Sequence, residues 1–163
     1  MLVASDTSPI SNLAIIGRLD LLRKQFHEIW IPDAVRAELE GVSHPSANAT
    51  IQRAHADGWL KPRDIHQDHI VRFLLSDLDR GEAEAIVLGI QLPADLVLMD
   101  EREGRGAATR IGLRVTGVLG VLMRAKQDGE ILELKRVIDV LRTKAGFYVS
   151  SRLEQEVLKS SGE

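Results

Sequence analysis

Short apolar runs alternate with longer helical segments along the whole chain, and this alternation constrains the fold more than any other feature. Five runs have the length and composition of β-strands, at residues 2–4, 28–31, 59–61, 96–99 and 113–116. Strands that alternate with helices are typical of a parallel sheet whose two faces are both covered by helices. We therefore predict an α/β fold with a central parallel sheet.

Between the strands, apolar residues recur at helical spacing. Thr7 or Ser8 is a candidate N-cap and Pro9 a first helical residue, while Gly17 divides the first helical stretch. Helices are predicted at residues 10–22, 32–40, a stretch ending near 55, 82–91, 103–111, 117–127, 131–144 and 152–159. Because 163 residues suit one domain and no linker or repeat interrupts them, we predict a single domain over residues 1–163, with residues 132–163 as a C-terminal helical extension.

The composition excludes several classes of protein. The chain has no Cys, which removes disulfides, thiolate zinc sites and cysteine nucleophiles. It has neither the basic start and apolar stretch of a signal peptide nor 18 consecutive apolar residues, so a cytoplasmic protein with no membrane association is expected. The formal net charge of −3 gives no general attraction for nucleic acid.

Four acidic residues occupy positions where parallel-sheet proteins bind ligands. Asp6 follows the first strand and Asp100 follows the strand at residues 96–99, so both belong at the carboxyl edge of the sheet. Glu82 lies in the first turn of a buried helix that begins at this edge, and Glu38 lies on the helix after the second strand. Four converging carboxylates require a cation, and Mg²⁺ prefers oxygen ligands. Because a divalent ion lowers the pKa of coordinated water, the pattern predicts hydrolysis of phosphodiesters.

Each acid also has a purely structural explanation. Asp6 is a possible helix cap, and Asp79 with Glu82 matches a capping box. Glu38 alone suits a solvated helix face, and Asp100 is a common turn former. The four together, in alternating α/β order, are more specific than any one of them.

Four segments resemble PIN-domain proteins, and more narrowly the prokaryotic VapC-like toxins of toxin–antitoxin pairs. They are LVASDTSPISNLAIIGRLDLL, IWIPDAVRAELE, LDRGEAEAIVLGI and LVLMDEREGRGAATRIGLRVTGVLGVLMRAKQDGEI. The resemblance implies a three-layer α/β/α sandwich, a PIN-like fold, and a Mg²⁺- or Mn²⁺-dependent endoribonuclease. It also implies an RNA substrate, a small antitoxin partner and a homodimer.

The resemblance assigns the catalytic positions to Asp6, Glu38, Glu82 and Asp100. Metal ligands would be Asp6, Glu82 and Asp100, with Glu38 and Glu82 binding the ion or orienting its water. Thr7 or Ser8 would support Asp6 or contact substrate through a hydroxyl. The chain departs from the family pattern in having Glu at position 82, where Asp is more common. The sequence leaves open whether Glu101 or Glu84 joins the site.

A basic segment follows the last acid. Residues 102–126 hold six Lys or Arg residues against Glu103 alone, and Arg102 and Arg105 are candidates for holding substrate phosphates or for a solvated helix face. Six aromatic residues give no sign of a stacking platform, and His66 and His69 lie in a polar stretch expected at the surface.

A metal-dependent ribonuclease is therefore the leading hypothesis. A PIN-like domain retained for binding or regulation, with little or no catalysis, is the alternative. An aspartyl-phosphate phosphatase or receiver domain is disfavoured, because Ser8 stands where the phosphatase form has its second Asp.

Overall fold

A computed structural model describes residues 1–163 and contains one five-stranded sheet. All neighbouring strands are parallel, in the order β3-β2-β1-β4-β5. The strands are β1 (Val3–Ser5), β2 (Ile29–Ile31), β3 (Leu60–Pro62), β4 (Leu96–Leu98) and β5 (Val115–Thr116). Each lies within one residue of a predicted run or inside it, so the α/β fold class with a central parallel sheet is confirmed.

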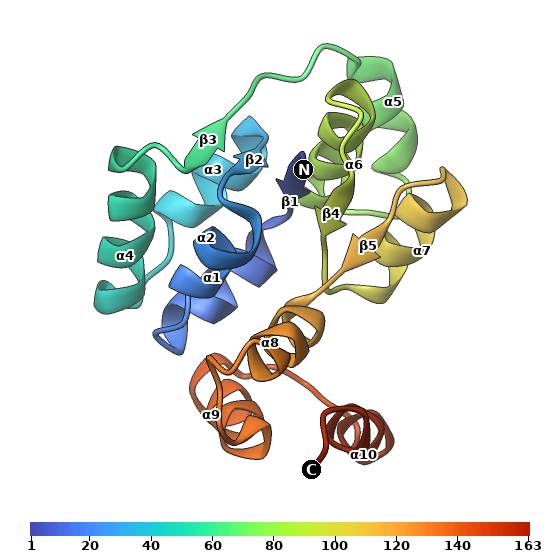
Figure 1. Ribbon diagram of the computed structural model, residues 1–163. Coiled ribbons are helices and arrows are strands. Elements are labelled where there is room, and N and C mark those ends of the chain that lie inside the picture. The colour runs from blue at the N-terminus through green and yellow to red at the C-terminus, as the bar shows by residue number, and fades with distance from the viewer.

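Ten helices connect and follow the strands (Figure 1). They are α1 (Thr7–Ile15), α2 (Asp20–Phe26), α3 (Asp33–Glu40), α4 (Pro45–Ala56), α5 (Asp68–Leu74), α6 (Arg80–Gln91), α7 (Arg102–Arg110), α8 (Val118–Gln127), α9 (Leu134–Ala145) and α10 (Ser151–Ser160). The predicted break at Gly17 is present, because this residue adopts a positive φ of 72° between α1 and α2. Helix α5 was not predicted.

The sheet separates two apolar cores, as the three-layer architecture requires. Val3 and Leu98 belong to one core, whereas their neighbours Ala4 and Val97 belong to the other, which is the alternation of a strand buried on both faces. The first core contains residues of α1–α4 and α8–α10, and the second contains residues of α5–α7. Figure 1 shows these two groups of helices on opposite sides of the sheet.

Charged side chains join the last two helices to each other and to α8, in addition to the contacts of the first core. Arg142 of α9 donates to Glu154 of α10 at 2.7 Å. The Glu163 carboxylate accepts from the Leu134 backbone N–H at 2.6 Å and pairs with Lys126 at 3.1 Å, so it caps the start of α9. None of the ten helices combines the length and apolar character needed to cross a membrane.

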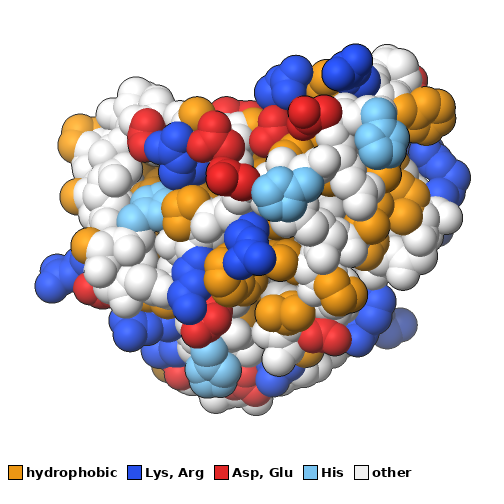
Figure 2. Space-filling view, turned by 90° about the horizontal axis from the view of Figure 1, so that it is seen from above, with side chains coloured by type: hydrophobic (Ala, Val, Ile, Leu, Met, Phe, Trp, Pro, Cys, Tyr) orange, Lys and Arg blue, Asp and Glu red, His pale blue; other side chains and the backbone are white.

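Charge is unevenly distributed over the surface. On the face seen in Figure 2, acidic side chains gather in one area, and basic side chains lie around it and along the rim. The net charge of −3 is therefore a poor guide to the local charge that a ligand meets.

Candidate active site

The strand order places a site between β1 and β4. The order in which the chain adds strands to the sheet reverses there. Strands β2 and β3 lie on one side of β1, whereas β4 and β5 lie on its other side. Ligands of open parallel sheets bind beyond the carboxyl ends of the strands at such a reversal. Asp6 directly follows β1, and Asp100 lies two residues beyond β4.

A pocket of about 420 Å³ at this edge is lined entirely by polar residues. Seven of the ten are acidic, and none is Lys or Arg. The lining consists of Asp6, Thr7, Ser8, Ser11, Glu38, Asp77, Asp79, Glu82, Glu101 and Glu103. The predicted residues Asp6, Thr7, Ser8, Glu38 and Glu82 are thus brought together. Carboxylates gathered without a basic residue repel one another unless a cation or protons neutralise them.

Asp6 is the most strongly perturbed of these acids. Its side chain is 5% exposed and makes no capping bond to α1, although Asp6 occupies the N-cap position. Its backbone N–H donates to the Leu98 carbonyl at 2.9 Å, which joins the ends of β1 and β4. The pKa of Asp6 is raised from 3.8 to about 7, mainly by burial. The negative charges of Asp79, Glu82 and Glu38 raise it further, whereas a hydrogen bond from the Thr7 amide lowers it.

Glu82 serves both the helix and the pocket. Its Oε2 accepts from the Asp79 backbone N–H at 3.1 Å, and its own N–H donates to Asp79 Oδ1 at 2.8 Å, which forms the predicted capping box. The side chain is 6% exposed, and its Oε1 has no protein donor. Burial raises the pKa of Glu82, and the nearby Asp79, Glu101 and Glu103 charges raise it further.

Two carboxylates approach Gly81 closely because this residue has no side chain. A Cβ atom at this position would lie 2.6 Å from Glu38 Oε1 and 3.1 Å from Asp6 Oδ1. Glu38 is held in this direction because Thr7 Oγ1 donates to its Oε2 at 2.8 Å. Oxygens of Glu38 and Asp6 therefore converge from α3 and the end of β1 on the first turn of α6.

Asp100 occupies a different position from the other three predicted acids. It does not line the pocket, and both of its oxygens have protein donors. Ser8 Oγ donates to Oδ2 at 2.9 Å, and the Val118 backbone N–H donates to Oδ1 at 2.8 Å. Burial raises the pKa of Asp100, while the Val118 amide, the Ser8 hydroxyl and Arg105 lower it. Asp100 thus connects the beginnings of α1 and α8.

The two predicted phosphate-binding arginines diverge. Arg105 turns inward, where its Nη1 donates to the Met99 carbonyl at 2.9 Å beside Asp100. Arg102 lines a separate groove between α5 and α7.

Of the two acids left open by the sequence, Glu101 lines the pocket and Glu84 does not. Glu84 Oε1 instead accepts from the Ala34 backbone N–H at 3.2 Å, at the beginning of α3. Three acidic lining residues were missed as site residues, namely Asp77, Asp79 and Glu103. Their signal in the sequence is their place next to the beginnings of α6 and α7, which point at the same edge.

The chemistry of the pocket fits a hard divalent cation. All the side-chain donors are carboxylate or hydroxyl oxygens, the ligand type that Mg²⁺ and Mn²⁺ prefer. No three of the His, Asp or Glu side chains are closely enough arranged to form a complete metal-binding group by themselves. Mg²⁺ typically keeps several waters and takes only one or two carboxylates, so a partly open arrangement of this kind suits it.

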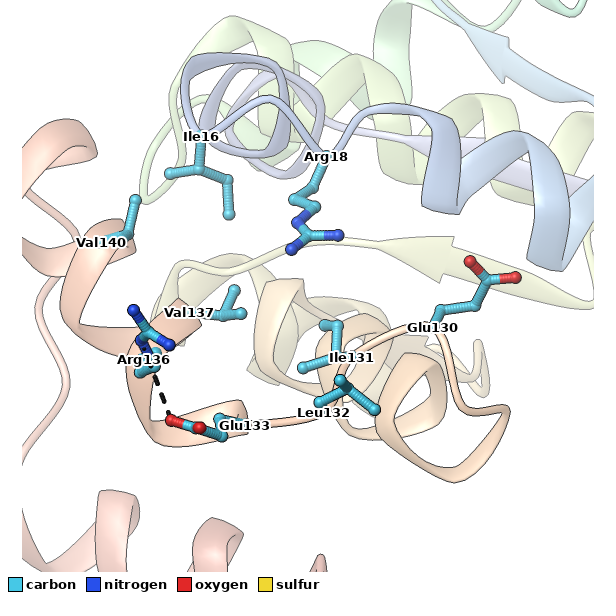
Figure 3. A pocket seen from close by; sticks show the side chains of 9 residues that line it. All are labelled: Ile16, Arg18, Glu130, Ile131, Leu132, Glu133, Arg136, Val137 and Val140. Atoms are coloured by element: carbon cyan, nitrogen blue, oxygen red, sulfur yellow. Dashed lines mark ion pairs between the residues drawn. The ribbon is translucent and has the colours of Figure 1, made fainter.

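A second groove, of about 470 Å³, lies between the end of α1 and α9 and is shown in Figure 3. Apolar side chains such as Ile16, Val137 and Val140 line it, together with a Glu133–Arg136 ion pair of 3.8 Å. Its two acids both have basic partners, since Glu130 pairs with Lys24 at 2.6 Å. It therefore lacks the unneutralised carboxylates of the first pocket.

Comparison with known proteins agrees with this architecture. No curated protein matches the chain. A family model, DUF3368, described as a PIN domain, matches residues 2–163, which is nearly the whole sequence and includes every residue of the acidic pocket. The chain belongs to this PIN-domain family.

Proposed function

We propose that the protein is a Mg²⁺- or Mn²⁺-dependent endoribonuclease whose metal ion binds in the acidic pocket. The observation that carries the proposal is a pocket lined by seven carboxylates and by no Lys or Arg. It lies where the strand order of a PIN-domain fold reverses. Two of those carboxylates, Asp6 and Glu82, are almost completely buried, where an unneutralised charge is costly.

Asp6 and Glu82 are the proposed metal ligands, with Glu38 beside them. A bound divalent ion would supply charge to the scissile phosphate and lower the pKa of water. Asp6 Oδ1 and Glu38 Oε1 both lie close to where a Cβ on Gly81 would stand, and Glu82 Oε1 is free of protein donors. Thr7 fixes the Glu38 carboxylate through its hydroxyl, so its role is positioning.

The third ligand predicted from the sequence, Asp100, has a distinct proposed role. Its contacts with Ser8 and Val118 hold the α1 and α8 termini at the edge of the pocket. Binding a metal through Asp100 would require one of these two hydrogen bonds to be replaced. We therefore assign Asp100 and Ser8 to the support of the site and Asp6 and Glu82 to its centre.

The decisive experiment is the substitution Asp6→Asn. It keeps the shape of the side chain but removes a buried charge, so metal-dependent RNA cleavage should fall by at least about 100-fold, a loss typical of removing one preorganised catalytic interaction. Cleavage of labelled RNA is measured with and without Mg²⁺ or Mn²⁺. Asp20→Asn, at an exposed position on α2, is the matched control and should cleave like the unaltered protein. Undiminished cleavage by Asp6→Asn would contradict the proposal.

A role as the toxin of a toxin–antitoxin pair is the finer proposal, supported by the DTSP and GEAEAI motifs. Expression should arrest growth, and Asp6→Asn should abolish the arrest. A gene for a small DNA-binding protein next to this one would supply the antitoxin. Arrest by both forms would exclude ribonuclease activity as its cause.

A binding domain without catalysis remains the second candidate, favoured by the protein donors on both Asp100 oxygens. Calorimetric titration with Mn²⁺ distinguishes the two functions. The ribonuclease requires a divalent site that Asp6→Asn removes, whereas the binding domain requires none.

A further inference from the structure

A groove of about 640 Å³ lies between α5 and α7, next to the acidic pocket. The two spaces are adjacent, because Asp77 and Glu103 line both of them. Beyond these shared acids the groove differs in character. Its remaining lining combines one exposed aromatic ring, apolar side chains and two arginines.

The aromatic ring is Phe73, on α5. Its side chain is 78% exposed, although α5 buries its neighbour Leu74 and also Val71 in the second core. A phenylalanine exposed to this extent gains little from folding, because its apolar surface stays in water. It does provide a flat face on which a nucleic-acid base can stack, and such stacking tolerates any base sequence.

The two arginines are Arg102 and Arg110, both on α7. They are eight residues apart, or about 12 Å along the helix axis at 1.5 Å per residue. Neither forms an ion pair within the protein, despite the acids nearby. Gly106 lies between them and has no side chain, and a Cβ there would stand 3.4 Å from Arg110 Nη1. The Arg110 guanidinium therefore lies back over Gly106, along the groove.

We propose that this groove binds single-stranded RNA as it leaves the acidic pocket, with a base stacked on Phe73 and backbone phosphates held by Arg102 and Arg110. The proposal rests on the ribonuclease function proposed above, and it specifies the strand's path. The acids that the groove shares with the pocket lie next to the proposed metal ion, which would offset their repulsion of phosphate. The unpaired arginines lie along α7, where the strand has no metal to neutralise it.

The test compares RNA binding by two variants, Phe73→Ala and the double substitution Arg102→Ala/Arg110→Ala. Binding of a short fluorescein-labelled single-stranded RNA is followed by anisotropy in EDTA, which prevents metal-dependent cleavage, over a series of salt concentrations. Because every form then lacks the ion, the repulsion from Asp77 and Glu103 is the same in all of them and cancels in the comparison. Tyr148→Ala and Arg152→Ala are the matched controls. Tyr148 is 84% exposed and the Arg152 side chain is 91% exposed. Tyr148 lies just before α10 and Arg152 lies on it, and neither lines the acidic pocket or the groove.

The two variants should fail in different ways. Loss of one stacked base should weaken binding about 5- to 150-fold and leave the salt dependence unchanged. Loss of two phosphate contacts should lower the slope of log affinity against log salt by about 1.4, at about 0.7 per phosphate for single strands. The controls should bind like the unaltered protein. Far-UV circular dichroism confirms that each variant is folded.

Unchanged affinity in either variant would overturn the proposed path. A change of oligomeric state in Phe73→Ala without loss of RNA affinity would also overturn it, since the groove would then be an interface between copies of the chain. Cleavage assays in Mg²⁺ separate this proposal from the ribonuclease proposal. If the unaltered protein cleaves RNA and the variants cleave it with unchanged KM, only the groove is wrong. If the variants lose binding but no form cleaves RNA, only the ribonuclease proposal is wrong.

Discussion

At Asp6, burial and negative neighbours both oppose ionisation of the carboxyl group. The pKa of about 7 places its titration near neutral pH, whereas the unfolded chain titrates near 3.8. Glu82 and Asp100 are shifted in the same direction, also mainly by burial. In the absence of a cation, ionisation of these three carboxyl groups therefore lowers the free energy of unfolding.

Stability without metal should depend on pH in a direction fixed by these shifts. Between pH 3.8 and about 7 the folded Asp6 binds more protons than the unfolded one. The free energy of unfolding in EDTA should therefore fall as pH rises through this window, by up to about 4 kcal/mol at 1.36 kcal/mol per unit. Urea unfolding at a series of pH values measures it. Asp6→Asn should show a shallower fall, and an equal fall in both forms would contradict the assignment.

Residue patterns predicted three of the acids that line the pocket, but not how the neighbouring side chains are held. Asp6, Glu38 and Glu82 were predicted from their places at strand and helix ends, and those places are set by backbone topology. The inward turn of Arg105 and the two donors on Asp100 depend on side-chain direction. They also depend on Gly117, because a side chain there would clash with Asp100 where it accepts from the Val118 amide. Such contacts join segments far apart in sequence, so no local pattern reports them.

Helix α6 contributes to the site through its first turn and to the core through the rest of its length. Two glycines mark this division. Gly81 faces the oxygens of Glu38 and Asp6, whereas a Cβ on Gly89 would lie 2.9 Å from Val97 and 3.3 Å from Leu113. One helix thus offers a matched pair of glycine-to-alanine changes with opposite consequences.

Gly81→Ala should lower RNA cleavage at least about tenfold, because its Cβ would displace the Glu38 and Asp6 oxygens. It should keep or slightly raise the free energy of unfolding, because alanine is favoured over glycine by about 1 kcal/mol in helices and the displaced atoms are at the ends of side chains. Gly89→Ala should instead destabilise the protein by about 1–3 kcal/mol through overpacking and leave the rate per folded molecule unchanged. Cleavage rates and urea unfolding measure both. Loss of stability in Gly81→Ala with full activity would contradict the proposed role of the two carboxylates beside Gly81.

Among the elements, α5 shows where sequence patterns fail. Its seven residues, Asp68–Leu74, follow a polar stretch, and its N-cap residue Gln67 makes no side-chain capping bond. Only Val71 and Leu74 are buried in it, too few for a helical period to be recognised. Longer helices such as α6 and α9 bury several residues at regular spacing and were predicted to within a few residues.

At the scale of the whole molecule, a bound cation should stabilise the fold. An ion at about 100 times its Kd adds about 2.7 kcal/mol, which corresponds to a rise in Tm of about 5–10 °C for a domain of this size. Thermal unfolding with Mn²⁺ and with EDTA measures the shift. The rise should be larger at pH 7 than at pH 5, because protons compete with the ion at Asp6, and Asp6→Asn should remove most of it. An equal rise in Asp6→Asn would place the ion elsewhere.

The strand order also determines when the pocket can exist during folding. The first 62 residues contain β1, β2 and β3, and they carry Asp6 and Glu38 but none of the other pocket acids. Of those acids, Asp77, Asp79 and Glu82 come after β3, and Glu101 and Glu103 come only after β4, the strand that pairs with the other edge of β1. Such long-range parallel pairing is slow to form. A nascent chain or an N-terminal fragment therefore carries only part of the proposed metal site, and the proposed nuclease would act only after the sheet is complete.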